Sequence, residues 1–183
     1  SKRRKVEEQN RLYDLLQKET VLQMTLLNDL LIRYHTAPEA EKRPLLAQCA
    51  VVGAYLKRSA NLIFLSQRQE TLAAAELRYA LEESLGSLEL AGVDCALTVL
   101  PDQPLPSAAA LACYRTFEAV VEQALGQLDA LLVQVRWVEN ALELRLSVET
   151  AADLTPLTAA ARKWERNDTS WLFHYRFGGG DKC

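Results

Sequence analysis

The residues best placed to do chemistry are two glutamates in an otherwise apolar segment, TFEAVVEQAL at positions 116–125. Glu118 and Glu122 are four residues apart, so both lie on the same face of the predicted helix. Such a pair can bind a divalent cation, divide the roles of general acid and general base, or point into water. No glycine lies between Gly126 and Gly178 to form a phosphate-binding loop beside the pair. We therefore expect solvated side chains and no metal ion, with a divalent-ion site as the alternative.

Neither the cysteines nor the histidines are spaced for metal binding. The four cysteines are Cys49, Cys95, Cys113 and Cys183. They form no CxxC or Cys/His pair, which indicates neither a zinc site nor a disulfide framework and favours a reducing compartment. The two histidines, His35 and His174, are far apart in the sequence.

Composition favours a folded, soluble chain. It has 183 residues, of which 49% are hydrophobic, and a formal net charge of -3. These values are typical of one or two small domains and argue against a nucleic-acid binder. The first residues, SKRRKV, resemble the cytoplasmic flank of a membrane span, although a solvated arm explains them equally well. A cytoplasmic domain tethered to a membrane by residues outside this chain is therefore one expectation.

The first third of the chain predicts two long helices. Leucines recur every three or four residues from Val6 to His35, and the pattern resumes from Leu45 to Leu65. The intervening HTAPEAEKRP carries Pro38 and Pro44 and predicts a loop, so the helices should pack antiparallel as a hairpin. Because a lone hairpin leaves much of its apolar stripe uncovered, we expect a homodimer with a four-helix bundle.

The rest of the chain predicts an α/β sandwich. Its expected helices are residues 72–91, 107–125 with Ser107 as the cap, and 153–165; its expected strands are 93–99, 131–138, 141–148 and 171–177. Helices on one side of a mixed sheet would leave the other sheet face open to water. The predicted fold class is α+β, with a hairpin domain at residues 1–69 and the sandwich at residues 70–183.

Three segments resemble the cytoplasmic region of two-component sensor histidine kinases, nearest the DesK-like branch. RLYDLLQKETVLQMTLLNDLL is similar to the first hairpin helix, with Tyr13 and Asp14 at the place of the family's His-Asp pair. FEAVVEQAL is similar to the N box, with Glu118 at the Glu and Glu122 at the magnesium-binding Asn. LRLSVETAAD is similar to the strand before the Asp-x-Gly motif, with Thr150 at the Asp. The resemblance implies a dimerisation hairpin and a reduced GHKL-type ATPase sandwich.

The departures from the family pattern predict a pseudokinase. The phenol of Tyr13 cannot replace the imidazole that forms phosphohistidine, and the magnesium ligand, the adenine-binding Asp and the glycine loops are absent. We expect no catalytic residue and no cofactor, and a dimeric scaffold for a response regulator or another signalling protein. The alternative is a divergent kinase that binds ATP and magnesium, with its acceptor at His35. A phosphatase-like hairpin that uses Asp14 and Lys18 is a third hypothesis.

The segment that replaces the ATP lid predicts a closed site. Leu154, Leu157, Ala160 and Trp164 have helical spacing. Their apolar stripe should pack on the sheet or beside the 107–125 helix, because leaving it in water costs about 25 cal/mol per Å². We therefore expect a helix at residues 153–165 that fills the degenerate site, with Trp164 mostly buried.

Overall fold

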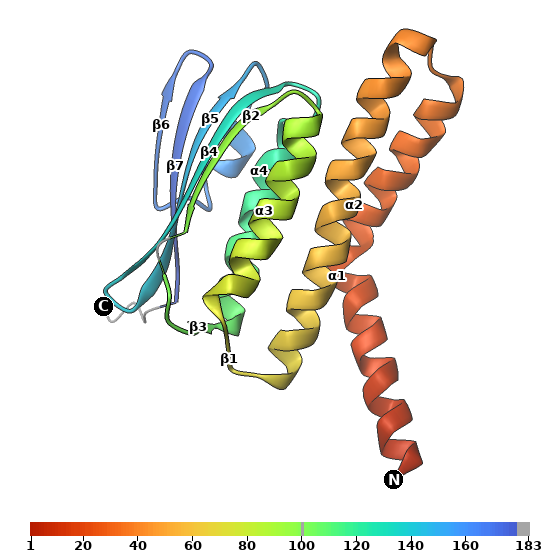
Figure 1. The fold of residues 1–183 in the computed structure, drawn as a ribbon, viewed down its shortest axis with the longest axis vertical. Helices are drawn as coiled ribbons and strands as arrows, with labels where there is room; N and C mark the ends of the chain where they lie inside the picture. Colours follow the sequence, from red (N-terminus) through yellow and green to blue (C-terminus); the bar gives the residue numbers. More distant parts are fainter. Residues whose placement is uncertain (100, 179–183) are drawn as a thin grey trace.

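The chain forms three layers in the computed structural model, which describes residues 1–99 and 101–178 (Figure 1). A hairpin of long helices lies on one side, two shorter helices in the middle, and a sheet on the other side. The helices are α1 (Lys2–Thr36), α2 (Glu39–Arg68), α3 (Ala74–Leu90) and α4 (Ser107–Gln123), with a 3₁₀ turn η1 (Thr155–Leu157). The strands are β1 (Thr71–Leu72), β2 (Asp94–Val99), β3 (Leu105–Pro106), β4 (Leu128–Val138), β5 (Ala141–Thr150), β6 (Lys163–Asn167) and β7 (Ser170–Phe177). The predicted α+β class, a helical hairpin followed by an α/β sandwich, is confirmed.

The hairpin matches the leucine pattern, but its loop is shorter than predicted. Ala37 and Pro38 alone separate the two helices, since α2 begins at Glu39 rather than at Leu45. Pro44 lies inside α2, where its missing N–H removes one backbone hydrogen bond without ending the helix. Among the described residues, no helix is both long and apolar enough to cross a membrane.

The main sheet has the strand order β2-β4-β5-β7-β6, with β2 parallel to β4 and the other neighbours antiparallel. The predicted tight turn between β4 and β5 is present. Glu139 and Asn140 both have positive φ, 51° and 62°, as a two-residue turn that follows the twist of the strands requires.

Two predictions about the sandwich are wrong. Residues 153–165 do not form a helix: the segment contains only η1 and then enters β6, where Trp164 remains 48% exposed. Strand pairing with β7 overrides the helical spacing, because it satisfies backbone groups that the short segment would otherwise leave open. Ser107 does not cap α4, since its hydroxyl donates to the carbonyl of Gln69 at 2.7 Å.

The helices α3 and α4 are buried on two sides. Their apolar residues form one core with the inner face of the sheet and with four residues of α2: Val51, Tyr55, Leu62 and Ile63. A smaller cluster around Leu30 and Val52 joins α1 to α2 near the hairpin loop. The predicted open face of the sheet lies opposite the helices (Figure 1). The division into residues 1–69 and 70–183 stays a prediction, although the two parts share this core.

Candidate functional site

The prediction that Glu118 and Glu122 point into water is wrong for Glu118. Its side chain projects from α4 towards the hairpin and is 1% exposed, and Glu122 is half-buried one turn later. The face of α4 that carries the pair packs against α2, so that tertiary packing covers a face that the sequence pattern assigned to solvent.

The surroundings of Glu118 favour its protonated form over the ionised carboxylate. Neither carboxyl oxygen of Glu118, nor Oε2 of Glu122, receives a hydrogen bond from the described residues. Burial raises the pKa of Glu118 well above its usual value, and the neighbouring Glu122 carboxylate raises it further. A proton on Glu118 lets it donate to the Glu122 carboxylate, and the pair then holds one negative charge instead of two.

Polar groups from the three other helices surround the pair. Gln23 of α1 donates from Nε2 to Oε1 of Glu122 at 3.2 Å. Tyr55 of α2 is buried, and this burial is the main cause that raises its pKa to about 12. The hydroxyls of Tyr114 and Ser84 share a hydrogen bond at 2.7 Å, which links α4 to α3. These partners were missed by sequence reasoning, because each comes from a different helix and no local motif joins them.

An ion pair closes the outer side of this interface. Arg115 Nη2 of α4 lies 2.6 Å from Glu19 Oε2 of α1. Around Glu118 the facing ionisable groups are therefore Tyr55, Tyr114 and the Arg115–Glu19 pair, besides Glu122. Among the described residues, no cationic side chain besides Arg115 faces the two carboxylates, and none forms an ion pair with them.

The side-chain hydroxyl of Thr150 is used in hydrogen bonds within the protein. Its side chain is 1% exposed, and Oγ1 donates to the carbonyl of Gln127 at 2.7 Å. The same oxygen accepts a hydrogen bond from the backbone N–H of Ala152 at 3.1 Å, so the residue shapes the turn at the end of β5. The position that the resemblance assigns to the adenine-binding Asp therefore has a structural role here.

The segment after Thr150 covers the end of α4, as predicted, but as a turn and not as a helix. Leu154 is fully buried in the main core and Leu157 packs against it. Gln123 Nε2 donates to the carbonyl of Asp153 at 3.2 Å, which ties this segment to α4. Asp153 in turn accepts hydrogen bonds from the hydroxyl and the backbone N–H of Thr155, and these lower its pKa.

The acceptor-equivalent residues lie apart from this cluster. Tyr13 is 63% exposed on α1, and Asp14 is also exposed. The polar side-chain contacts from α1 to α4 are made by Glu19 and Gln23, about two to three turns further along α1. His35 is exposed at the end of α1, where its ring meets Tyr34 edge to face at 5.9 Å. The structure thus brings Glu118 and Glu122 together with the hairpin, but not with Tyr13.

No metal site is formed among the described residues, in which no three His, Cys, Asp or Glu side chains cluster. Cys49, Cys95 and Cys113 are free thiols, and burial raises the pKa of the Cys113 thiol to about 12, so that it is unreactive. Cys183 lies outside the described residues.

Comparison with solved structures identifies the fold. A structure described as a bacterial phosphotransferase is 9% identical with a TM-score of 0.51, and the match covers 92% of this chain and 95% of that chain. The blue-light activated histidine kinase of Erythrobacter litoralis EL346 is 8% identical with a TM-score of 0.51, and the match covers 92% of this chain and 63% of that chain. The fold is that of a histidine kinase domain. At these identities the likeness concerns the fold alone, which agrees with the resemblance in the sequence.

The histidine kinase AdeS of Acinetobacter baumannii is also similar, at 13% identity and a TM-score of 0.45, over 89% of this chain and 98% of that chain. No protein-family model and no curated protein sequence matches the chain.

Proposed function

We propose that the chain is a histidine kinase-like signalling protein that dimerises and transmits conformational signals to a partner without phosphoryl transfer. The fold supports a role in signal transduction, and the residues at the family's motif positions support the loss of chemistry. Neither ATP nor magnesium takes part in this function.

The burial of Glu118 is the observation that carries the proposal. At the N-box position, a carboxylate that assists phosphoryl transfer must reach water or a nucleotide, and it must be ionised to accept a proton. Glu118 is 1% exposed, and its surroundings favour the protonated form. Its role is therefore to join α4 to the hairpin.

Other residues of the chain fill the rest of the degenerate nucleotide site. Thr150 is used by the turn that ends β5, and Leu154 fills the space beside α4. A nucleotide bound in this place would have to displace Leu154 from the core, which opposes binding by the free energy of exposing a buried leucine, about 1.5–3 kcal/mol.

The surface of the hairpin supports the proposed homodimer. Apolar side chains remain exposed along α1, at Val21, Met24, Leu31 and Ile32, and at Leu46 near the start of α2. Val21, Met24 and Leu31 follow one another at helical spacing, so they form a stripe on one side of α1. A second hairpin packed on this stripe would bury it in a four-helix bundle. The proposed partner is a response regulator or another signalling protein, and a membrane tether outside this chain remains part of the proposal.

Calorimetric titration with ATP and magnesium tests the loss of nucleotide binding. We expect no binding heat at nucleotide concentrations up to the millimolar range. The matched variant Glu122→Asn restores the family's residue and is expected to remain unable to bind, because Leu154 still fills the site. Micromolar binding by the unmodified protein would contradict the proposal and favour the divergent kinase, whose acceptor at His35 could then be sought by labelling. Binding gained by Glu122→Asn alone would mean that the site is open and lacks one ligand.

A further inference from the structure

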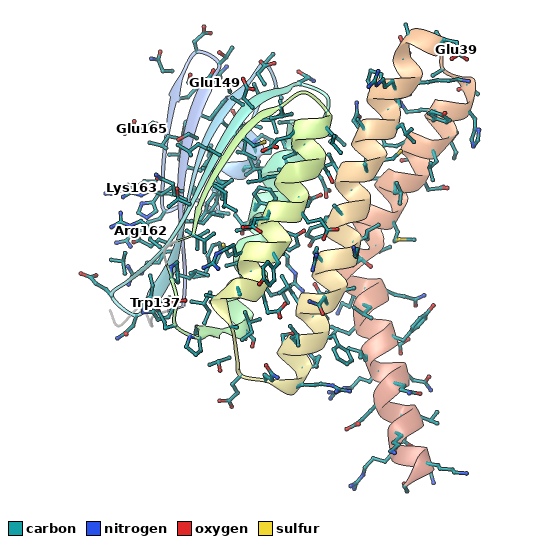
Figure 2. The ribbon with its side chains drawn as sticks, viewed as in Figure 1. Glu39, Trp137, Glu149, Arg162, Lys163 and Glu165 are labelled. Atoms are coloured by element: carbon teal, nitrogen blue, oxygen red, sulfur yellow. The ribbon has the colours of Figure 1, made fainter. Side chains whose placement is uncertain are left out.

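The open face of the sheet carries a row of polar and basic side chains that the proposed function does not use. Gln134 on β4 pairs in register with Arg145 on β5, which pairs with His174 on β7, which pairs with Lys163 on β6. Their chain neighbours Val133, Leu144 and Phe173 are buried under the helices. Because successive residues of a strand point to opposite faces, the row points away from the helices. Figure 2 shows Arg162, Lys163 and Glu165 at this far side of the molecule.

Of the row, only His174 has a carboxylate partner within the described residues, and the permanent charges of Arg145 and Lys163 have none. The nearest buried carboxylate, Glu143, lies 3.4 Å from Nε2 of His174 and 3.6 Å from Nη1 of Arg176. Neither Arg145 nor Lys163 forms an ion pair in the described part of the chain.

A cavity of about 270 Å³ lies over the row. It is lined by Gln134, Arg145, Lys163 and His174, with Leu172 and Glu165 also at its wall. The Glu165 carboxylate offsets one of the two positive charges that Arg145 and Lys163 bring to the wall, so that one remains. The cavity therefore has an excess of hydrogen-bond donors and of positive charge, and its volume fits a small ligand rather than a nucleotide.

We propose that this cavity is a binding site for a small oxyanion, a ligand that carries a phosphoryl or carboxylate group. The guanidinium of Arg145 can hold two oxygens at once, Lys163 supplies a point charge, and the Gln134 amide and the His174 ring each supply an N–H donor. The apolar side chain of Leu172 contacts the uncharged part of the ligand. The site lies on the opposite side of the sheet from Glu118 and is independent of the degenerate nucleotide site.

Nuclear magnetic resonance of the two histidine rings tests the site on the unmodified protein. Inorganic phosphate and, separately, citrate are titrated at constant ionic strength with chloride as the reference anion. We expect the ring signals of His174 to shift and to saturate with phosphate or citrate, with a dissociation constant in the millimolar range or below. The signals of His35 should stay in place, because this residue lies at the far end of the hairpin (Figure 1). Equal shifts of both rings, shifts that never saturate, or no shift of His174 would overturn the proposal.

Two variants and one control assign the binding to the row. Arg145→Gln and Lys163→Gln each remove one exposed charge, and each should weaken phosphate binding by about tenfold or more, since a charge-assisted hydrogen bond is lost. Arg33→Gln removes an exposed charge on α1 and should leave the affinity unchanged. Full affinity in both row variants, or an equal loss in Arg33→Gln, would show nonspecific attraction of anions. If one row variant does not fold, the other decides.

Discussion

Replacing Glu118 by glutamine tests whether the buried pair holds a proton. Glutamine has nearly the shape of a protonated glutamate, stays neutral at every pH, and can donate from its amide to the Glu122 carboxylate. In the native protein, a raised pKa means that Glu118 stays protonated in the folded state above pH 4.5, where the unfolded chain has released the proton. The stabilising contribution of Glu118 is therefore complete below about pH 4.5 and is lost as the pH rises.

The size of the effect follows from proton linkage. When the folded state binds one proton more than the unfolded state, the free energy of unfolding falls by about 1.4 kcal/mol for each pH unit. Between pH 5 and pH 7 the unmodified protein should lose up to about 2.7 kcal/mol that Glu118→Gln retains. For a chain of this size, the difference corresponds to about 5–10 °C in Tm. Glu83 and Asp153 have lowered pKa values, so their contributions are lost only at lower pH and do not mask the effect.

Urea denaturation at pH 5, 6, 7 and 8 measures this slope directly. The matched control is Glu82→Gln, which neutralises an exposed glutamate on α3 and should keep the pH dependence of the unmodified protein. The comparison uses slopes, so a uniform loss of stability in Glu118→Gln does not affect it. A slope in Glu118→Gln equal to that of the unmodified protein would refute the reasoning, because the extra proton would then lie elsewhere.

Four further predictions follow from the packing. Val21→Asp combined with Met24→Asp should give a monomer in sedimentation, because both side chains are exposed on the proposed dimer stripe; an unchanged dimer would place the interface elsewhere. Tyr13→His should show no autophosphorylation with labelled ATP, and labelled phosphate on this variant would contradict the closed site. Leu154→Ala should lower the free energy of unfolding by about 2–5 kcal/mol in urea denaturation, since Leu154 is fully buried. Asn140→Val should lower the free energy of unfolding by about 1–2 kcal/mol, because a β-branched residue is strained at the φ of 62°, whereas Asn140→Gly should not lower it. Equal stability of the two variants in urea denaturation would argue against strain at this turn.

Elements with a local signal could be predicted from the sequence. The leucine spacing of α1 and α2 and the alternation in β5 and β7 reflect a single buried face in each element. The Glu139–Asn140 turn was visible because two alternating segments meet at two polar residues that accept positive φ.

The elements that were missed depend on contacts distant in sequence. Residues 154–164 have helical spacing when taken alone, but β7 offers a strand edge to residues 163–167. The turn at Asp168, with φ 57°, folds β6 onto β7. The polar pair Asp168–Thr169 between two aromatic segments was the available signal for this hairpin. The sequence shows one apolar face of α4 and so places Glu118 on the water side. In the structure, α2 covers that side as well, and no local pattern reveals a helix buried on both sides.

The same double burial limits how the proposed signal could pass through the molecule. Four residues of α2, Val51, Tyr55, Leu62 and Ile63, belong to the core that holds α3 and α4. Burying such side chains stabilises by about 1.5–3 kcal/mol each, so exposing all four costs on the order of 6–12 kcal/mol, comparable with the stability of a whole domain. A nucleotide that displaced Leu154 would still not reach the Glu118 carboxylate unless this interface also opened. Under the proposed function, a change of hairpin geometry would move α3, α4 and the sheet with α2, because they share one core, and the signal would reach the open sheet face through packing alone.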